Sequence, residues 1–279
     1  MPYQSGPSAK VLELVEQCGG NIWTSCTDTV AGGVAVARAV VEMHVVPDKA
    51  KTLLGWRPID VPAALAAAES TLAVFDIQGV NYNFQPQEVI CGNVAGSLLA
   101  TGSMLAACSE YYDVFAPVAG GEVINVGVEP CDALAGGRRS GAEFTWTDVR
   151  LPLPVIRSLC SREIAILAAG VVAGLAMPIT DANELIEVGG CATMSASTAI
   201  DEINMTLILR CTAMPINEIR IMLEPVGPVA VTPGSQVAYV SRRLERMKFS
   251  QPSVTVTADW DLDILLAAAG QAVHYIRWI

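Results

Sequence analysis

The sequence predicts an α+β protein with a mainly helical N-terminal part, a β-rich middle part and a closing C-terminal helix. Segments of good helix formers, each preceded by a capping residue, fill most of the first 115 residues. From about residue 117 glycine and proline become frequent, and short runs alternate between apolar and polar residues. We therefore expect a helical domain of residues 1–115 plus 261–279 and a β-rich domain of residues 116–260.

The N-terminal helices are predicted from their capping signals. Ser8, Asp28 and Asp60 each precede an apolar segment, as N-capping residues do. A Val-Pro pair after Asp60 suits the first turn of a helix, and the alanine-rich run that follows has high helix propensity. The predicted helices are residues 8 to 18, residues 30 to 46 (ended by Pro47), the run AALAAAESTLAVF after Asp60, and residues 94 to 112.

Short alternating segments in the middle of the chain predict strands. Ile219 and Ile221 alternate with Arg220 and Met222, which is typical of a strand with one buried face. The runs PVGP and TPGS supply turns between such segments. A sandwich or a barrel is the expected architecture. The predicted strands are residues 143 to 149, 219 to 223, 237 to 240 and 254 to 260.

Two later segments are expected to be helical. Residues 262 to 278 form the closing helix, and residues 164 to 180 (IAILAAGVVAGLAMPIT) carry no charge. Gly170 and Gly174 have the spacing that lets two helices approach closely. Seventeen residues is the short limit for crossing a hydrocarbon core of roughly 30 Å, and Pro178 lies near the end. A core or interface helix is favoured, which makes membrane association unlikely, and a span over 164–180 is the alternative.

Composition favours a protein that buries surface against other subunits. Hydrophobic residues make up 52% of the chain and charged residues 16%, and the mean hydropathy is +0.43. This number of polar side chains is too small to cover the surface of an ordinary soluble monomer. Part of the apolar surface must therefore face other subunits or lipid. The thirteen arginines and four lysines point the same way, since arginine is enriched in interfaces.

The charge excludes one class of partner and suggests one kind of contact. A net charge of −11 disfavours direct nucleic-acid binding. Arg242, Arg243 and Arg246 form the densest basic cluster, which we interpret as a salt-bridging contact with an acidic neighbour; a solvated loop is the alternative. The eight cysteines form no C-x-x-C pair, and the N-terminus lacks a signal-peptide core, so free thiols in a reducing compartment are expected.

No motif in the sequence indicates a known catalytic site. His44 and His274 are the only histidines, and G-x-S-x-G, Walker A and G-x-G-x-x-G patterns are absent. We expect no catalysis and no cofactor, although an enzyme with a histidine-free carboxylate or cysteine site stays open. On a strand, Asp259, Asp261 and Asp263 would share one face and form a cation site. Alternatively Asp261 or Asp263 caps the closing helix, and this helix cap is favoured.

Block order and composition together resemble the T=13 shell proteins of reoviruses. In that family a jelly-roll domain is inserted in a helical domain, and trimers cover an inner capsid. The resemblance implies a homotrimer in an outer or intermediate icosahedral shell, with an inner capsid shell protein as partner. It also implies a virion location and assembly in the host cytoplasm. No diagnostic motif matches, so no residue role is carried over. We keep as candidate subunit contacts, because of their residue types and spacing alone, Gly170, Gly174 and the three arginines.

Overall fold

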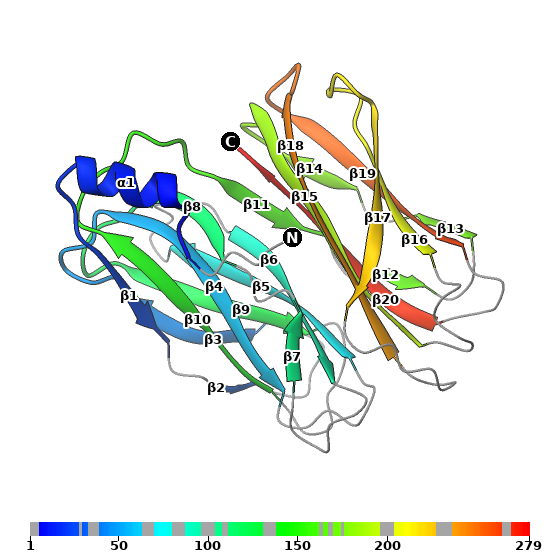
Figure 1. Cartoon of the computed structure of the whole chain (residues 1–279), viewed down its shortest axis with the longest axis horizontal. Coiled ribbons are helices and arrows are strands. Elements are labelled where there is room, and N and C mark those ends of the chain that lie inside the picture. Colours follow the sequence, from blue (N-terminus) through cyan, green and yellow to red (C-terminus); the bar gives the residue numbers. More distant parts are fainter. Residues whose placement is uncertain are drawn as a thin grey trace.

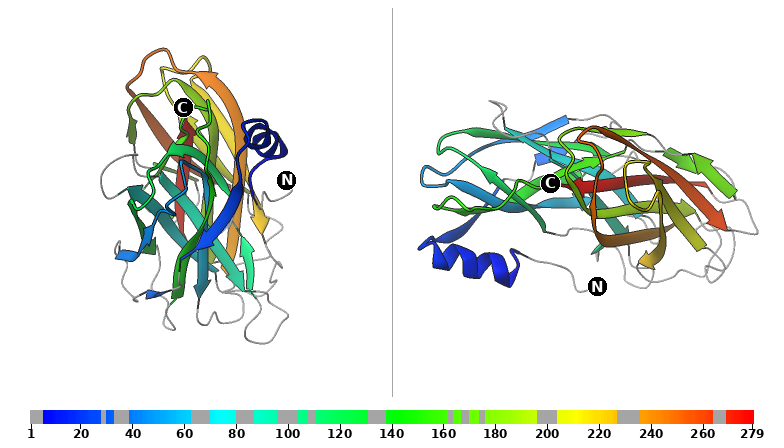
Figure 2. Two further views of the ribbon diagram at one scale, coloured as in Figure 1. Left: turned by 90° about the vertical axis from the view of Figure 1, so that its left-hand side faces the viewer. Right: turned by 90° about the horizontal axis from the view of Figure 1, so that it is seen from above.

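A computed structural model describes residues 6–27, 30–32, 39–62, 70–79, 87–95, 104–107, 111–130, 138–161, 164–166, 170–173, 176–195, 204–226, 236–263 and 269–279. In these residues the chain forms β-strands and one helix, α1 (Ala9–Gln17). The strands gather into two bodies that lie side by side (Figures 1 and 2). We name the N-terminal body roll 1 and the C-terminal body roll 2.

Roll 1 is a sandwich of two sheets. Its strands are β1 (Ile22–Cys26), β2 (Val30–Gly32), β3 (Ala39–Val45), β4 (Thr52–Pro62), β5 (Ser70–Gly79), β6 (Gln87–Ala95), β7 (Met104–Ala107), β8 (Tyr112–Pro117), β9 (Val123–Pro130) and β10 (Arg138–Thr147). Sheet I has the order β1-β10-β4-β8, with β2 beside β10. Sheet II has the order β3-β9-β5-β6, with β7 beside β6.

Roll 2 has the same two-sheet construction. Its strands are β11 (Arg157–Cys160), β12 (Ile164–Ile166), β13 (Gly170–Ala173), β14 (Met177–Ile179), β15 (Glu184–Ser195), β16 (Asn204–Arg210), β17 (Glu218–Val226), β18 (Gln236–Lys248), β19 (Val254–Asp263) and β20 (Ala269–Trp278). Sheet I has the order β11-β20-β15-β18, with β12 beside β20. Sheet II has the order β13-β19-β16-β17, with β14 beside β19. The end of β17 also pairs with the start of β18, so the two sheets of roll 2 are joined there.

The strand order of roll 1 is repeated in roll 2. When each short added strand is counted with the strand before it, both rolls read 1-8-3-6 in sheet I and 2-7-4-5 in sheet II. This is the order of an eight-stranded jelly roll. The chain is therefore a tandem of two jelly rolls. A parallel pairing of Ser158 with Gln87 joins β11 to β6, so the strand ladder continues from one roll into the other.

Each roll has its own core between its two sheets. Trp56, Phe144 and Trp146 are fully buried in the core of roll 1. Trp260 and Ile276 are fully buried in the core of roll 2. These large side chains alternate with outward residues along their strands, as the pleat requires.

The helix α1 lies on the outer face of sheet I of roll 1 (Figure 1). Val11 and Val15 pack against Leu54 of β4. Phe115 joins this cluster from β8, where its φ of 57° accompanies an irregular register between β8 and β4. Gly19, with a φ of 68°, ends the helix, as glycine commonly does. The predicted helix over residues 8 to 18 is confirmed, including its cap position at Ser8.

The predicted α+β class is wrong because the other expected helices are strands. Residues 30 to 46 contain β2 and β3, the run after Asp60 leads into β5, and residues 94 to 112 contain β7. Residues 262 to 278 contain β20 in place of the closing helix. The strands predicted around 143, 219, 237 and 254 are confirmed as parts of β10, β17, β18 and β19. The boundaries at residues 115 and 261 stay a prediction.

The apolar stretch 164–180 is also wrong as a helix. Its described residues form β12, β13 and β14, which pair with β20 and β19. Met177 and Ile179 point into the core of roll 2, whereas Val171 is 63% exposed. In the part of the chain that the structure describes, no helix has the length and apolarity needed to cross a bilayer. The alternative of a spanning helix over 164–180 is therefore withdrawn.

Candidate functional site

The predicted basic cluster lies on β18, at one border of sheet I of roll 2. The backbones of Arg242 and Arg243 pair with Gly189 and Val188 of β15. The Arg246 side chain is 77% exposed, and its Nη1 lies 3.7 Å from the Glu184 carboxylate. An exposed pair at this distance contributes little to stability. The assignment of this cluster to a subunit contact stays a prediction.

The predicted helix that would contain Gly170 and Gly174 is not formed in the described residues. Gly170 begins β13 and pairs with Leu262 of β19, while Gly174 lies outside the described residues. The close helix packing that G-x-x-x-G spacing permits does not apply to a strand. A subunit contact at these glycines would therefore have to use strand geometry.

The aspartates around Trp260 lie on β19, and β20 occupies most of the segment of the closing helix that they were expected to cap. Asp259 accepts a hydrogen bond from Arg210, which also bonds the Glu218 carboxylate with an Nε–Oε2 distance of 2.9 Å. These bonds raise the pKa of Arg210, with the Asp259 bond as the largest cause. Asp263 ends β19. Among the described residues, no three His, Cys, Asp or Glu side chains converge to hold a metal ion.

A buried polar cluster joins the two rolls. Glu187 of β15 accepts a hydrogen bond from Tyr275 at 2.6 Å and one from Arg277 at 2.7 Å, both from β20. The Glu187 and Arg277 side chains are 2% and 4% exposed. Arg277 also donates to the backbone carbonyl of Asp113 on β8, so this guanidinium bridges roll 2 to roll 1. The Arg277 Cζ atom lies 5.3 Å from the centre of the Tyr112 ring.

Further bonds tie the same joint. The backbone N–H of Cys160 donates to Glu88 of β6 at 2.9 Å, and the backbone N–H of Ile156 donates to Val114 of β8 at 2.8 Å. The Glu187–Arg277 ion pair of this cluster is buried and hydrogen-bonded. The cluster ties the two rolls to each other.

A serine–histidine pair connects β1 with β3 in roll 1. The ring of Trp146 donates to Ser25 Oγ at 2.8 Å, and this oxygen lies 2.9 Å from His44 Nε2. Since the indole can only donate, Ser25 is free to give its own proton to His44. Burial lowers the pKa of His44, so the ring is neutral and able to accept at pH 7. The His44 ring stacks on Phe144 at a centroid distance of 5.0 Å.

Cys26 on β1 lies beside a pair of charged side chains. Its Sγ lies 3.9 Å from Glu143, which pairs with Arg57 at 2.8 Å. Burial, followed by the charge of Glu143, raises the pKa of Cys26. A raised pKa keeps the thiol protonated, which is the opposite of what a nucleophilic cysteine requires.

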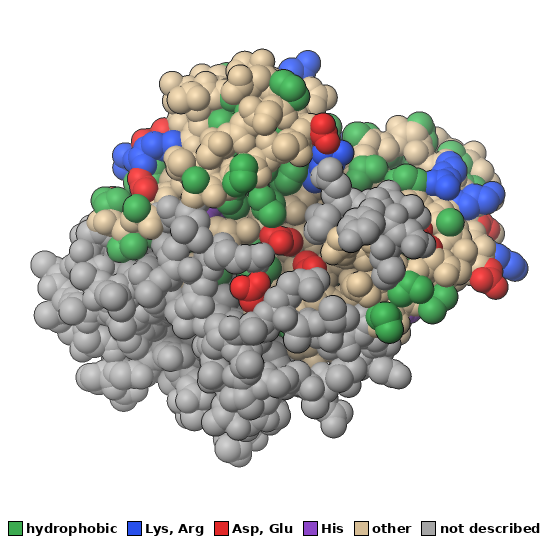
Figure 3. All heavy atoms as spheres, turned by 180° about the vertical axis from the view of Figure 1, so that it is seen from behind, with side chains coloured by type: hydrophobic (Ala, Val, Ile, Leu, Met, Phe, Trp, Pro, Cys, Tyr) green, Lys and Arg blue, Asp and Glu red, His purple; other side chains and the backbone are tan. Residues whose placement is uncertain are grey.

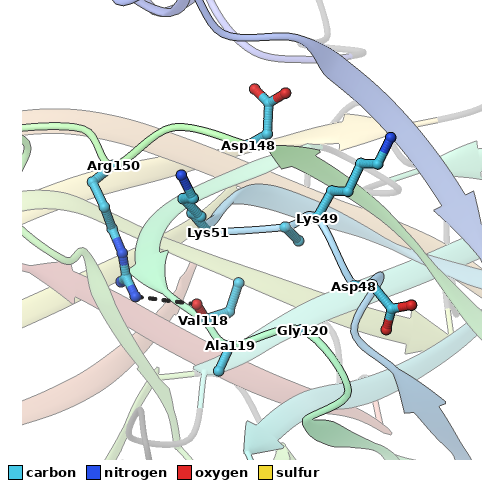
Figure 4. Close-up of a pocket in the computed structure, with 9 residues that line it drawn as sticks. Asp48, Lys49, Lys51, Val118, Ala119, Gly120, Asp148 and Arg150 are labelled. Atoms are coloured by element: carbon cyan, nitrogen blue, oxygen red, sulfur yellow. Dashed lines mark hydrogen bonds between the residues drawn. The ribbon is translucent and has the colours of Figure 1, made fainter.

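An open hollow in roll 1 is lined by residues before β4, between β8 and β9, and after β10 (Figure 4). It has a volume of about 720 Å³ and is lined by Lys49, Lys51 and Arg150 together with two aspartates, Asp48 and Asp148. Hydrogen bonds from Asn21 lower the pKa of Asp148, and Arg150 donates to the Val118 carbonyl at 3.3 Å. The cations and carboxylates nearly balance, so the hollow has no strong preference for ligand charge.

Exposed apolar side chains are dispersed over the described surface. Those more than half exposed are Met43, Val45, Val171, Ile216 and Met222. On the face seen in Figure 3 the hydrophobic side chains reach the surface in several separate places. All five belong to strands of sheet II or, for Ile216, to the turn between β16 and β17.

Sequence reasoning missed the joint between the rolls and the Ser25–His44 pair. A signal for the first was present: Arg277 stands in the apolar run VHYIRWI, and Glu187 stands in LIEV. A charged residue inside a strand-like apolar run is typical of a buried ion pair, since it must be compensated. The Ser25–His44 pair joins strands of opposite sheets, so no local pattern in the sequence indicates it.

Comparison with known proteins gives no family. No family model matches the chain, and no curated protein matches it. Among solved structures, the chain is similar to the STIV MCP (12% identity, TM-score 0.46, covering 93% of this chain and 97% of that one). It is similar to N-glycanase F (10%, TM-score 0.48, 92% and 95%) and to the infectious bursal disease virus VP2 subviral particle (11%, TM-score 0.30, 92% and 72%). At TM-scores below 0.5, no conclusion about function follows from these likenesses.

Proposed function

We propose that the chain is a structural virion protein that assembles as homotrimers in an outer or intermediate icosahedral shell. Its partners are further copies of itself and an inner capsid shell protein, with no direct contact to nucleic acid. It acts by shape, without catalysis or a cofactor. It resides in the virion and is assembled in the host cytoplasm.

The observation that carries this proposal is the repetition of one jelly roll within one chain. The contact between the rolls is heterologous, because sheet II of roll 1 faces sheet I of roll 2. Heterologous contacts that repeat form closed rings when the rotation allows it. A ring of three chains would present six bodies of one topology around its axis, which suits a lattice position surrounded by six neighbours.

The composition supports the same proposal. On the outer surfaces of the two sheets II, Met43, Val45 and Met222 are each more than half exposed. Separate exposed apolar side chains of this kind suit a subunit with several different neighbours. Many weak contacts then add through multivalency, so no single interface has to be strong.

Light scattering on a sizing column, with detergent-free protein over a range of concentrations, tests this proposal. The expected result is a particle of three times the 29.4 kDa chain mass, or larger shells built from it. A particle that stays at one chain mass at every concentration would contradict self-assembly.

A second candidate function is acyl transfer at Ser25, which the 2.9 Å contact between Ser25 Oγ and His44 Nε2 favours. A fluorophosphonate probe distinguishes the two functions. An enzyme would be labelled at Ser25 and lose the label in Ser25→Ala, whereas a shell protein would show the same background in both.

A further inference from the structure

The joint between the rolls shows which surfaces of a roll bind another roll. β5 and β6 of roll 1 lie against β15, β18 and β20 of roll 2. Val273, Tyr275 and Arg277 point away from the core of roll 2, yet each is at most 5% exposed because roll 1 covers them. In the 1–8 numbering of the jelly-roll strands, strands 4 and 5 of roll 1 pack on the outer face formed by strands 3, 6 and 8 of roll 2.

The equivalent receiving face of roll 1 consists of β4, β8 and β10. The helix α1 occupies this face. Val11 and Val15 pack there against Leu54 of β4, Phe115 of β8 and Val149, which follows β10. The segment before β1 therefore covers in roll 1 the position that a whole roll covers in roll 2.

The helix is weakly held on this face. It has nine residues, and only Val11 and Val15 are buried. The Ser8 side chain makes no capping hydrogen bond, and neither end carries a charge that complements the helix dipole. A helix of this length has little stability of its own. Undocking α1 consequently costs little and uncovers Leu54, which is fully buried beneath it.

The matching insertion surface of roll 2 is open. Strands 4 and 5 of that roll are β16 and β17, and β18 borders them. Met222 and Arg220 on β17 are 66% and 63% exposed, and Ile216 in the preceding turn is 59% exposed. The surface therefore offers apolar side chains for Leu54, together with the Arg220 guanidinium, which pairs with Glu218 at 2.6 Å.

We propose that the β16–β17 corner of one copy docks on the β4–β8–β10 face of roll 1 in a second copy and displaces α1 from it. The occupant is a second copy because the chain already makes this contact between its own two rolls. The inference rests on the proposed self-assembly and adds to it the two surfaces and a removable cover. α1 keeps the receiving face closed in the isolated chain and leaves it when the neighbour arrives.

Sedimentation equilibrium of full-length variants tests the cover. Val15→Asp places a charge on the buried side of α1, and Leu12→Asp places the same charge on its 42% exposed side. The proposal expects V15D to lower the dissociation constant of the assembly at least tenfold, while L12D stays within twofold of the wild type. Equal values for the two variants, or weaker association of V15D, would overturn it.

A second pair of variants tests the inserting corner without touching the core. Met222→Glu lies on β17, and Val171→Glu is a comparably exposed apolar position on β13, outside the proposed contact. M222E is expected to raise the dissociation constant at least tenfold, and V171E to leave it unchanged. Wild-type protein that assembles as tightly as M222E overturns the docking surface but leaves the proposed shell function standing. Monomers in the wild type and in V15D alike overturn the shell function itself.

Discussion

His274 lies in the core of roll 2 beside Trp260, with a ring-centroid distance of 6.3 Å. It is 1% exposed, and neither ring nitrogen has a hydrogen-bond partner. Burial lowers its pKa from 6.5 to about 3. The folded state therefore holds His274 neutral at pH values where the unfolded chain would protonate it.

This depressed pKa predicts a loss of stability in acid. The unfolded chain binds a proton below pH 6.5 that the folded chain does not bind until about pH 3, so stability falls across this interval. At pH 4.5 the cost relative to pH 7.5 is about 2–3 kcal/mol. His274→Leu should remove this part of the loss, measured by urea unfolding at both pH values. An unchanged pH dependence in the variant would contradict it.

The Glu187–Arg277 pair makes a second prediction for single residues. Arg277→Met leaves the Glu187 carboxylate buried, with a hydrogen bond from Tyr275 at 2.6 Å but without its cation. This should cost about 3–5 kcal/mol of unfolding free energy. Glu187→Gln combined with Arg277→Met should recover part of the loss, since no uncompensated charge remains. Urea denaturation of the two variants measures this. A double variant less stable than R277M would contradict the pairing.

Single residues also show how far the candidate site could be predicted. The basic neighbours of Arg246 in the sequence mark it as a candidate subunit contact, which stays a prediction, and its side chain is exposed. Glu187 and Arg277 were not identified, although each interrupts an apolar run. Glu187 and Arg277 are 90 residues apart in the chain, and no local sequence pattern indicates a contact over that distance.

At the level of elements, β20 explains why several strands were mistaken for helices. Ala272, Ile276 and Trp278 point into the core of roll 2, while Val273, Tyr275 and Arg277 are buried against roll 1. A strand buried on both faces loses the apolar–polar alternation and reads as a continuous apolar run. β5 behaves alike: Phe75 and Ile77 lie in the core, and Val74 and Asp76 are also buried. β17 was predicted correctly since Arg220 and Met222 face solvent.

The packing of β15 against β19 makes a prediction about a glycine. A Cβ at Gly190 would lie 2.7 Å from the Trp260 ring and 3.2 Å from Leu207. Gly190→Ala should therefore overpack the core of roll 2 and cost about 1–3 kcal/mol. Gly6→Ala is the matched control, because nothing lies within 4 Å of the added carbon. Thermal unfolding of both variants checks it, and equal midpoints would contradict the close approach.

For the whole molecule, the repeated jelly roll is the feature that the sequence concealed. The two rolls share a strand order but no detectable sequence repeat. Topology depends on pairings such as β1 with β10, which lie more than 100 residues apart, and local patterns do not report them. The expectation of a β-sandwich was correct in kind for the middle of the chain and applies to both rolls.

In the proposed assembly, the two rolls of each chain continue into a ring through further copies. Electron microscopy of the purified, detergent-free protein tests this ring. Class averages should show particles with threefold symmetry and six similar lobes around the axis, two for each chain. Isolated two-lobed particles at every concentration would contradict ring assembly.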